Sequence, residues 1–118
     1  MNTGIDIIAA ERQRQIEKEG WTKEHDDEHK KGELAEAAAC YAMSKNSRDF
    51  LKDATNDYLE ELGWDGSNSP VLWPWDYEWW KEEPEDRIKE LAKAGALIAA
   101  EIDRLLRIKE LEDNLEEE

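Results

Sequence analysis

Apolar residues recur every three or four positions in four stretches of the chain, the spacing of a helix with one buried face. We expect helices over residues 5–19, 32–45, 49–62 and 85–107. Glycine follows the first stretch at Gly20 and the third at Gly63, where it favours the end of a helix. The pattern therefore predicts an all-α fold, an antiparallel helical bundle of about four helices joined in part by a long Trp-rich loop.

The helix expected over residues 85–107 has the most regular apolar pattern. Pro84 stands just before it, a position where proline is tolerated. We expect its buried face to carry Ile88, Leu91, Ala92, Gly95, Ile98, Ile102, Leu105 and Leu106. Leu111 and Leu115 could extend the helix by a turn or two. We assign residues 1–109 to a single helical domain and residues 110–118 to an acidic C-terminal tail.

Small residues predict which helices pack together. The helix expected between Gly32 and Lys45 is rich in alanine, so a second helix can approach it closely. The segment Leu91–Ile98 has the same character around Gly95. We expect these two helices to be partners, with a ligand site at the edge of their contact.

The segment between the first two helices is dense in groups that bind metals or move protons. His25, Asp26, Asp27 and His29 lie within five residues, and no helical period persists from 21 to 31, so we expect a loop. A solvated loop with helix-capping acids is the alternative. The spacing is not that of a structural zinc finger. Just beyond, Glu33 and Glu36 share one helical face.

Tryptophan is concentrated in the long connection over residues 64–84. Four of the six tryptophans lie between Trp73 and Trp80, and Pro74 excludes a regular helix across them. A connection of this length is usually functional or packs as its own cluster. We expect most of these indoles to cover the bundle or to form a contact between subunits. Trp73 and Trp75 are the candidates for stacking on a base or another flat ligand.

Charge excludes some partners. The chain carries a formal net charge of -15, and 40% of its residues are charged. DNA and RNA polymers and anionic membranes require a basic surface, which we do not find, so we exclude them as partners. Cys40 is the single cysteine, so an intrachain disulfide is impossible, and we expect a cytoplasmic protein without a secretory signal or a transmembrane segment.

Five segments together resemble a family of small phage and prophage proteins, mostly uncharacterised. They are ERQRQIEKEGW from Glu11, HDDEH from His25, GELAEAAACYA from Gly32, WPW from Trp73 and KAGALIAAEIDRL from Lys93. The resemblance covers over half of the chain. It implies a phage origin, and hence the cytoplasm of an infected bacterial host, with a role in nucleotide metabolism or in countering host defence.

A weaker resemblance is to the all-α, MazG-like nucleoside triphosphate pyrophosphohydrolases. These enzymes bind magnesium through an EExxE-type motif on one helix and an ExxD motif on the next. Glu33 and Glu36 are similar to the first motif, but the second stretch, which begins at Glu90, has Lys93 in place of the final aspartate. A lysine there would compete with a metal and could itself bind phosphate.

Our leading hypothesis is a binding protein that needs no cofactor and sequesters a cyclic or ADP-ribose-type signalling nucleotide. Lys93 and Arg12 would hold phosphate, and an indole of Trp73 or Trp75 would stack on the base. Glu33 or Glu36 would accept hydrogen bonds from ribose hydroxyls or base amines. The candidate ligand-binding set is completed by His25, Asp26 and His29.

The alternative is a magnesium-dependent pyrophosphohydrolase. In that case Glu33, Glu36, Asp26 and Asp27 would hold the metal, with a histidine as the general base for water. A third hypothesis is an interaction protein that uses its acidic surface or its tryptophans. In each case the small core and the exposed aromatic loop predict a homo-oligomer, most simply a dimer.

Overall fold

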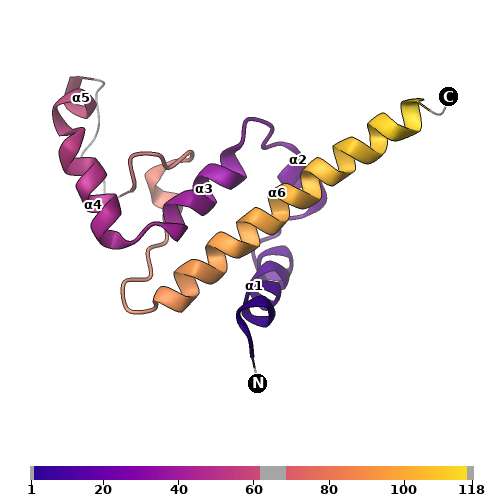
Figure 1. Cartoon of the computed structure of the whole chain (residues 1–118), viewed down its shortest axis with the longest axis horizontal. Coiled ribbons are helices and arrows are strands. Elements are labelled where there is room, and N and C mark those ends of the chain that lie inside the picture. Colours follow the sequence, from indigo (N-terminus) through magenta and orange to yellow (C-terminus); the bar gives the residue numbers. More distant parts are fainter. Residues whose placement is uncertain (1, 62–68, 117–118) are drawn as a thin grey trace.

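The structure is a computed structural model that describes residues 2–61 and 69–116 and is built of helices (Figure 1). In the first part of the chain lie α1 (Gly4–Lys18), α2 (Lys23–Asp27) and α3 (Glu33–Ala42). They are followed by α4 (Lys45–Ala54), α5 (Asn56–Glu61), the short 3-10 helix η1 (Tyr77–Trp79) and α6 (Arg87–Glu116). The described residues contain no strand, so the predicted all-α class is confirmed.

The long helix α6 is the axis of the molecule. α3 runs beside it and α1 crosses it, while α4 and α5 stand apart and the last turns of α6 extend beyond α2 (Figure 1). The molecule measures 53 × 41 × 21 Å, so it is flat. The segment from 110 to 116, which we expected to form a separate tail, continues α6 without a break.

The core lies between α3 and α6 and is built mainly from small residues. Leu97 is the largest contribution of α6, and Leu34 and Tyr41 are the largest of α3. Around them are packed Ala37, Ala38, Cys40, Ala94 and Ala100. The predicted pairing of the alanine-rich helix with the segment around Gly95 is therefore confirmed, because small side chains let the two backbones approach closely.

The prediction of the buried face of α6 is wrong for the large aliphatic residues. Most of the aliphatic side chains assigned to it are exposed, namely Ile88, Leu91, Ile98, Ile102, Leu105 and Leu106. The buried positions of α6 include Glu90, Lys93, Glu101 and Arg104 beside the alanines. The reason is that α3 packs on the opposite side of the helix from the aliphatic stripe.

Gly95 marks where α1 crosses α6. A methyl group built on Gly95 would lie 2.5 Å from Cδ1 and 2.7 Å from Cγ1 of Ile8. The absence of a side chain therefore lets α1 come close to α6 at this point. Gly95 serves the contact with α1 rather than the contact with α3.

Hydroxyl caps decide where three of the helices begin. Thr3 and Asp6 form a capping box on α1, and Thr22 caps α2. The prediction of a loop over 21–31 is thus wrong in part, because the cap at Thr22 starts a short helix. Ser44 caps α4, so this helix begins four residues before the predicted start at residue 49, and Asp49 pairs with Lys45. Thr55 separates α4 from α5, and the predicted end at 62 lies outside the described residues.

Arg48 ties α4 to the rest of the molecule. Its guanidinium is buried and donates to the carbonyl oxygens of Cys40 and Met43. It also contacts the carboxylates of Glu82 and Glu90, each at 3.3 Å. One buried cation therefore holds together the end of α3, the Trp-rich connection and the start of α6.

Candidate functional site

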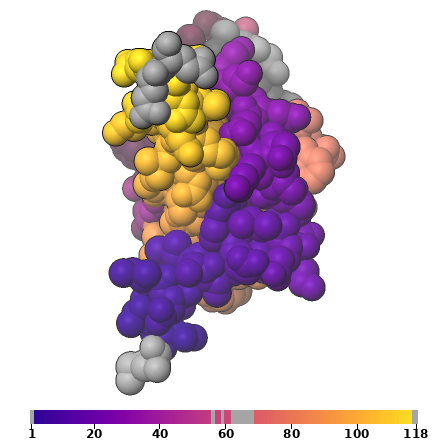
Figure 2. All heavy atoms as spheres, turned by 90° about the vertical axis from the view of Figure 1, so that its right-hand side faces the viewer, coloured from indigo at the N-terminus to yellow at the C-terminus, as the bar shows by residue number. Residues whose placement is uncertain are grey.

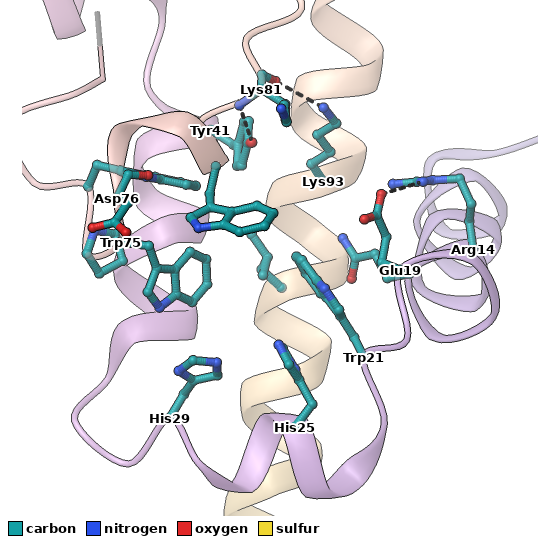
Figure 3. Close-up of a pocket in the computed structure, with 15 residues that line it drawn as sticks. Arg14, Glu19, Trp21, His25, His29, Tyr41, Trp75, Asp76, Lys81 and Lys93 are labelled. Carbon is teal, nitrogen blue, oxygen red and sulfur yellow. Dashed lines mark hydrogen bonds and ion pairs between the residues drawn. The ribbon is translucent and has the colours of Figure 1, made fainter. Parts of the chain in front are cut away.

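A cavity of about 820 Å³ opens between the first helices, the Trp-rich connection and α6 (Figure 3). Its volume lies within the range of small-molecule sites. The largest group in its lining is aromatic: Trp21, His25, His29, Tyr41, Trp73, Trp75 and Trp79. The remaining lining residues are Arg14, Gln15, Glu19, Pro74, Asp76, Lys81, Lys93 and Leu97. We call this the aromatic cavity.

The aromatic side chains form a continuous wall. Trp21 stacks on His25 with ring centroids 5.3 Å apart, and His25 meets the edge of His29 at 4.9 Å. His29 lies 5.2 Å from Trp75, which meets Trp73 edge to face at 5.4 Å. The wall thus joins the segment after α1 to the Trp-rich connection, which is about 50 residues later in the chain.

A stacked pair anchors the Trp-rich connection to the core. Trp80 is buried and stacks on Tyr41 at 4.5 Å, with the Arg48 guanidinium 5.1 Å from the Trp80 ring centre. The Tyr41 hydroxyl oxygen accepts a hydrogen bond from the backbone N–H of Lys81 at 3.1 Å. Burial raises the pKa of Tyr41 to about 12, so this ring remains a neutral wall at physiological pH.

Each histidine of the wall is held by a carboxylate. Nδ1 of His25 lies 3.0 Å from Asp26, and Nδ1 of His29 lies 3.1 Å from Glu33. Asp26 is fully buried and also accepts from Arg12 at 2.9 Å. An ionised carboxylate only accepts, so each Nδ1 carries the proton and each Nε2 is left for the cavity.

The Glu33 carboxylate is well placed to hold His29. Burial opposes its ionisation, but hydrogen bonds from His29 and from the backbone N–H of Lys31 outweigh burial and lower the pKa of Glu33. The orientation of His29 is therefore fixed by an ionised partner across the neutral pH range. Figure 3 shows His25 and His29 pointing from the same side toward Trp21 and Trp75.

Cations lie at the rim of the aromatic cavity. Arg14 is paired with Glu11 and Glu19, which raises its pKa, chiefly through the hydrogen bond to Glu11. Lys93 donates to the carbonyl oxygen of Lys81 at 3.0 Å and to Glu83 at 2.9 Å. Within the described residues, the Lys81 ammonium has no ion-pair partner and is the cation most available to a ligand.

Two polar atoms of the wall are buried without a hydrogen-bond partner in the described residues. They are Oε1 of Gln15 and Nε1 of Trp75. Gln15 is only 2% exposed, although glutamine is usually found on the surface. A buried acceptor and a buried donor without partners in a cavity wall are groups that a ligand can satisfy.

The structure brings together five of the predicted ligand-binding residues: His25, His29, Trp73, Trp75 and Lys93 line the aromatic cavity. The others do not line it. Arg12, Asp26 and Glu33 stand behind the wall, where Asp26 and Glu33 hold the histidines and Arg12 holds Asp26. Glu36 is exposed on α3.

The four acids of the metal-dependent alternative have other partners or lie apart. Asp26 is paired with Arg12, Asp27 with Arg107 at 2.7 Å, and Glu33 with His29. Within residues 2–61 and 69–116, no three histidine, cysteine or acidic side chains converge in a way that could hold a metal ion.

Sequence reasoning missed several lining residues, above all Gln15, Trp21, Tyr41 and Lys81. Gln15 interrupts the apolar face of α1, and Tyr41 falls on the buried face of α3, so their periodicity places both inward. Trp21 and Lys81 carried no such signal, because each lies in a connection outside the helices of the core.

No protein-family model, no curated protein and no solved structure matches this chain. No helix among the described residues combines the length and the apolar character that crossing a membrane requires.

Proposed function

We propose that the protein binds a nucleotide in the aromatic cavity and holds it without chemical change. The observation that carries this proposal is the wall of stacked and edge-on rings around a cavity of about 820 Å³. Flat heteroaromatic rings bind between aromatic side chains, and each stacked base typically contributes about 1–3 kcal/mol. Trp73 and Trp75 remain the candidates for stacking, and Trp21 joins them.

The phosphate would lie at the rim, near Lys81. This assignment replaces the predicted pair of Lys93 and Arg12. Lys93 already serves Glu83, whose pKa it lowers through its hydrogen bond, and Arg12 serves Asp26 away from the cavity. An acidic protein can bind a small anion in this way, because salt screens the repulsion from distant acidic groups more strongly than the attraction to a cation next to the anion.

Sequestration of a signal is the role that we propose for this binding. The resemblance to phage proteins favours a cyclic or ADP-ribose-type signalling nucleotide of host defence, bound in the cytoplasm of an infected bacterium. A protein that holds such a molecule intact needs neither metal nor a general base. The separate partners of Asp26, Asp27 and Glu33 favour this role over magnesium-dependent hydrolysis.

The experiment is incubation of the purified protein with nucleoside triphosphates and signalling nucleotides, with and without magnesium. Ligand released by heating is then identified by mass spectrometry. We expect intact ligand, whose calorimetric affinity falls in Lys81→Ala and is unchanged in Lys45→Ala, a matched lysine on exposed α4.

Two results would contradict the proposal. Monophosphate and pyrophosphate formed only with magnesium would establish the hydrolytic alternative. Failure of every nucleotide to bind, in a protein with a native circular dichroism spectrum, would remove the nucleotide assignment altogether.

A further inference from the structure

The inner wall of the aromatic cavity presents mainly hydrogen-bond acceptors. The carboxylates behind His25 and His29 accept hydrogen bonds from both Nδ1–H groups, so in the neutral form of each ring Nε2 carries a lone pair. Gln15 adds a third acceptor, because its Oε1 is buried and has no partner in the described part of the chain. These acceptors come from α1, from α2 and from just beyond α2.

One hydrogen-bond donor accompanies these acceptors in the wall. Nε1 of Trp75 is buried without a partner within the described residues, and the Trp75 ring lies 5.2 Å from His29. Indole N–H can only donate. A ligand that satisfies the wall must therefore offer N–H groups to the acceptors and one acceptor to Trp75.

From this arrangement we infer that the aromatic cavity selects bases that carry an exocyclic amino group over their oxo counterparts. An amino group offers two N–H donors, and the adjacent ring nitrogen of adenine or cytosine offers an acceptor. A base with a carbonyl at the same position would set an acceptor against His25, His29 or Gln15. The inference rests on the proposed nucleotide binding and names the base class.

The test compares two matched pairs by calorimetry at pH 8: adenosine against inosine monophosphate, and cytidine against uridine monophosphate. We expect the amino member of at least one pair to bind about tenfold tighter or more, which corresponds to one or two hydrogen bonds. Gln15→Leu should reduce this ratio, whereas Gln15→Glu, which keeps an acceptor, should preserve it.

The outcomes separate the two proposals. Equal affinity within both pairs, or preference for the oxo member, overturns the inference and leaves nucleotide binding intact. If none of the four binds and no nucleotide in the larger panel binds, the proposed function fails and the inference fails with it. A ratio that Gln15→Leu leaves unchanged in a folded variant also overturns the role of Gln15.

The exposed aliphatic side chains of α6 form a stripe that α1 crosses. The outward face of α6 bears Ile88, Leu91, Ile98, Ile102 and Leu105, which are between 46% and 65% exposed. Ile8 of α1 lies against this stripe at Gly95. We call this stripe the α6 seam. In Figure 2, α6 is visible as an orange-to-yellow column beside the violet N-terminal segments.

Discussion

The two faces of α6 differ in burial, and the face with the larger aliphatic residues is the more exposed one. The face toward α3 buries Ala94, Leu97 and Ala100 together with the charged Glu90 and Lys93. The outward face exposes the α6 seam, which contains the larger aliphatic residues of this helix. Burial within one chain is therefore decided here by how closely a partner helix can approach, and not by the amount of apolar surface that a residue offers.

Charged residues can occupy the buried face because each one has partners. Glu90 accepts from Arg48, from Arg87 and from the backbone N–H of Glu83. Glu101 and Arg104 pair with each other on the same side of the helix. The cost of removing these groups from water is offset by hydrogen bonds to the charged forms, so the face can be buried without being apolar.

The largest effect is expected from breaking the ion network of the buried face. Glu90→Gln leaves Arg48 buried with a weaker partner and should lower the free energy of unfolding by about 3–5 kcal/mol, measured in urea. Glu110→Gln on the exposed end of α6 should change it by less than about 0.5 kcal/mol. Equal effects of the two substitutions would contradict the difference between the faces.

A matched pair of leucines compares the faces directly. Leu97 is 1% exposed and Leu105 is 50% exposed. Leu97→Ala should cost about 2–5 kcal/mol, because it leaves a cavity between α3 and α6. Leu105→Ala should cost less than about 0.5 kcal/mol in samples dilute enough to be monomeric. A larger loss for Leu105→Ala under those conditions would show that the seam is buried within one chain.

Alkaline pH should destabilise the contact between α3 and α6. Burial raises the pKa of Cys40 to about 11 and that of Tyr41 to about 12, from ordinary values of 9.0 and 10.0. Both groups are neutral below these ordinary values, so their stabilisation is complete there and is lost as pH rises through the folded-state values. By pH 11 we expect a loss of about 3 kcal/mol.

Urea titrations between pH 8 and 11 measure this loss. Cys40→Ala should remove the part that begins near pH 9 and leave the part that begins near pH 10. A free energy of unfolding that is constant over this range would show that neither side chain is buried as described.

The smallest effect is expected where α1 meets α6. Gly95→Ala improves helix propensity by about 1 kcal/mol but forces Ile8 to move, so we expect a net loss of about 1 kcal/mol. In an Ile8→Ala background the same substitution should become stabilising. The double-mutant cycle measures this reversal, and an unchanged sign would mean that α1 does not cross α6 at Gly95.

Local signals predicted most of the helical segments. Spacing and glycine ends located α1, α3 and α6 to within a few residues, except for the C-terminal extension of α6. Hydroxyl caps at Thr22 and Ser44 were overlooked, and with them α2 and the true start of α4. These caps satisfy only one or two backbone N–H groups, so they leave no periodic trace in the sequence.

The sequence predicted several residues of the candidate site, but not which of them face the cavity. The dense segment at His25 and the tryptophans at Trp73 and Trp75 do line one cavity. Which side chains face the cavity and which support it could not be read from spacing. Arg14 and His25 line the cavity, whereas Arg12 and Asp26 stand behind it. Arg12 and Asp26 are held there because they pair with each other across two segments of the chain.

The sequence by itself determined the helical class, the close packing of the alanine-rich helix with α6 and the break that Pro74 imposes on the tryptophans. These follow from interactions between residues that are near in the chain, or from side-chain size alone. Only the tertiary structure decided which face of α6 is covered, which cation is left for a ligand and which acceptors line the aromatic cavity. Those outcomes depend on pairings such as Lys93 with Glu83 and Arg12 with Asp26, and a pairing between segments is fixed only when the helices have packed.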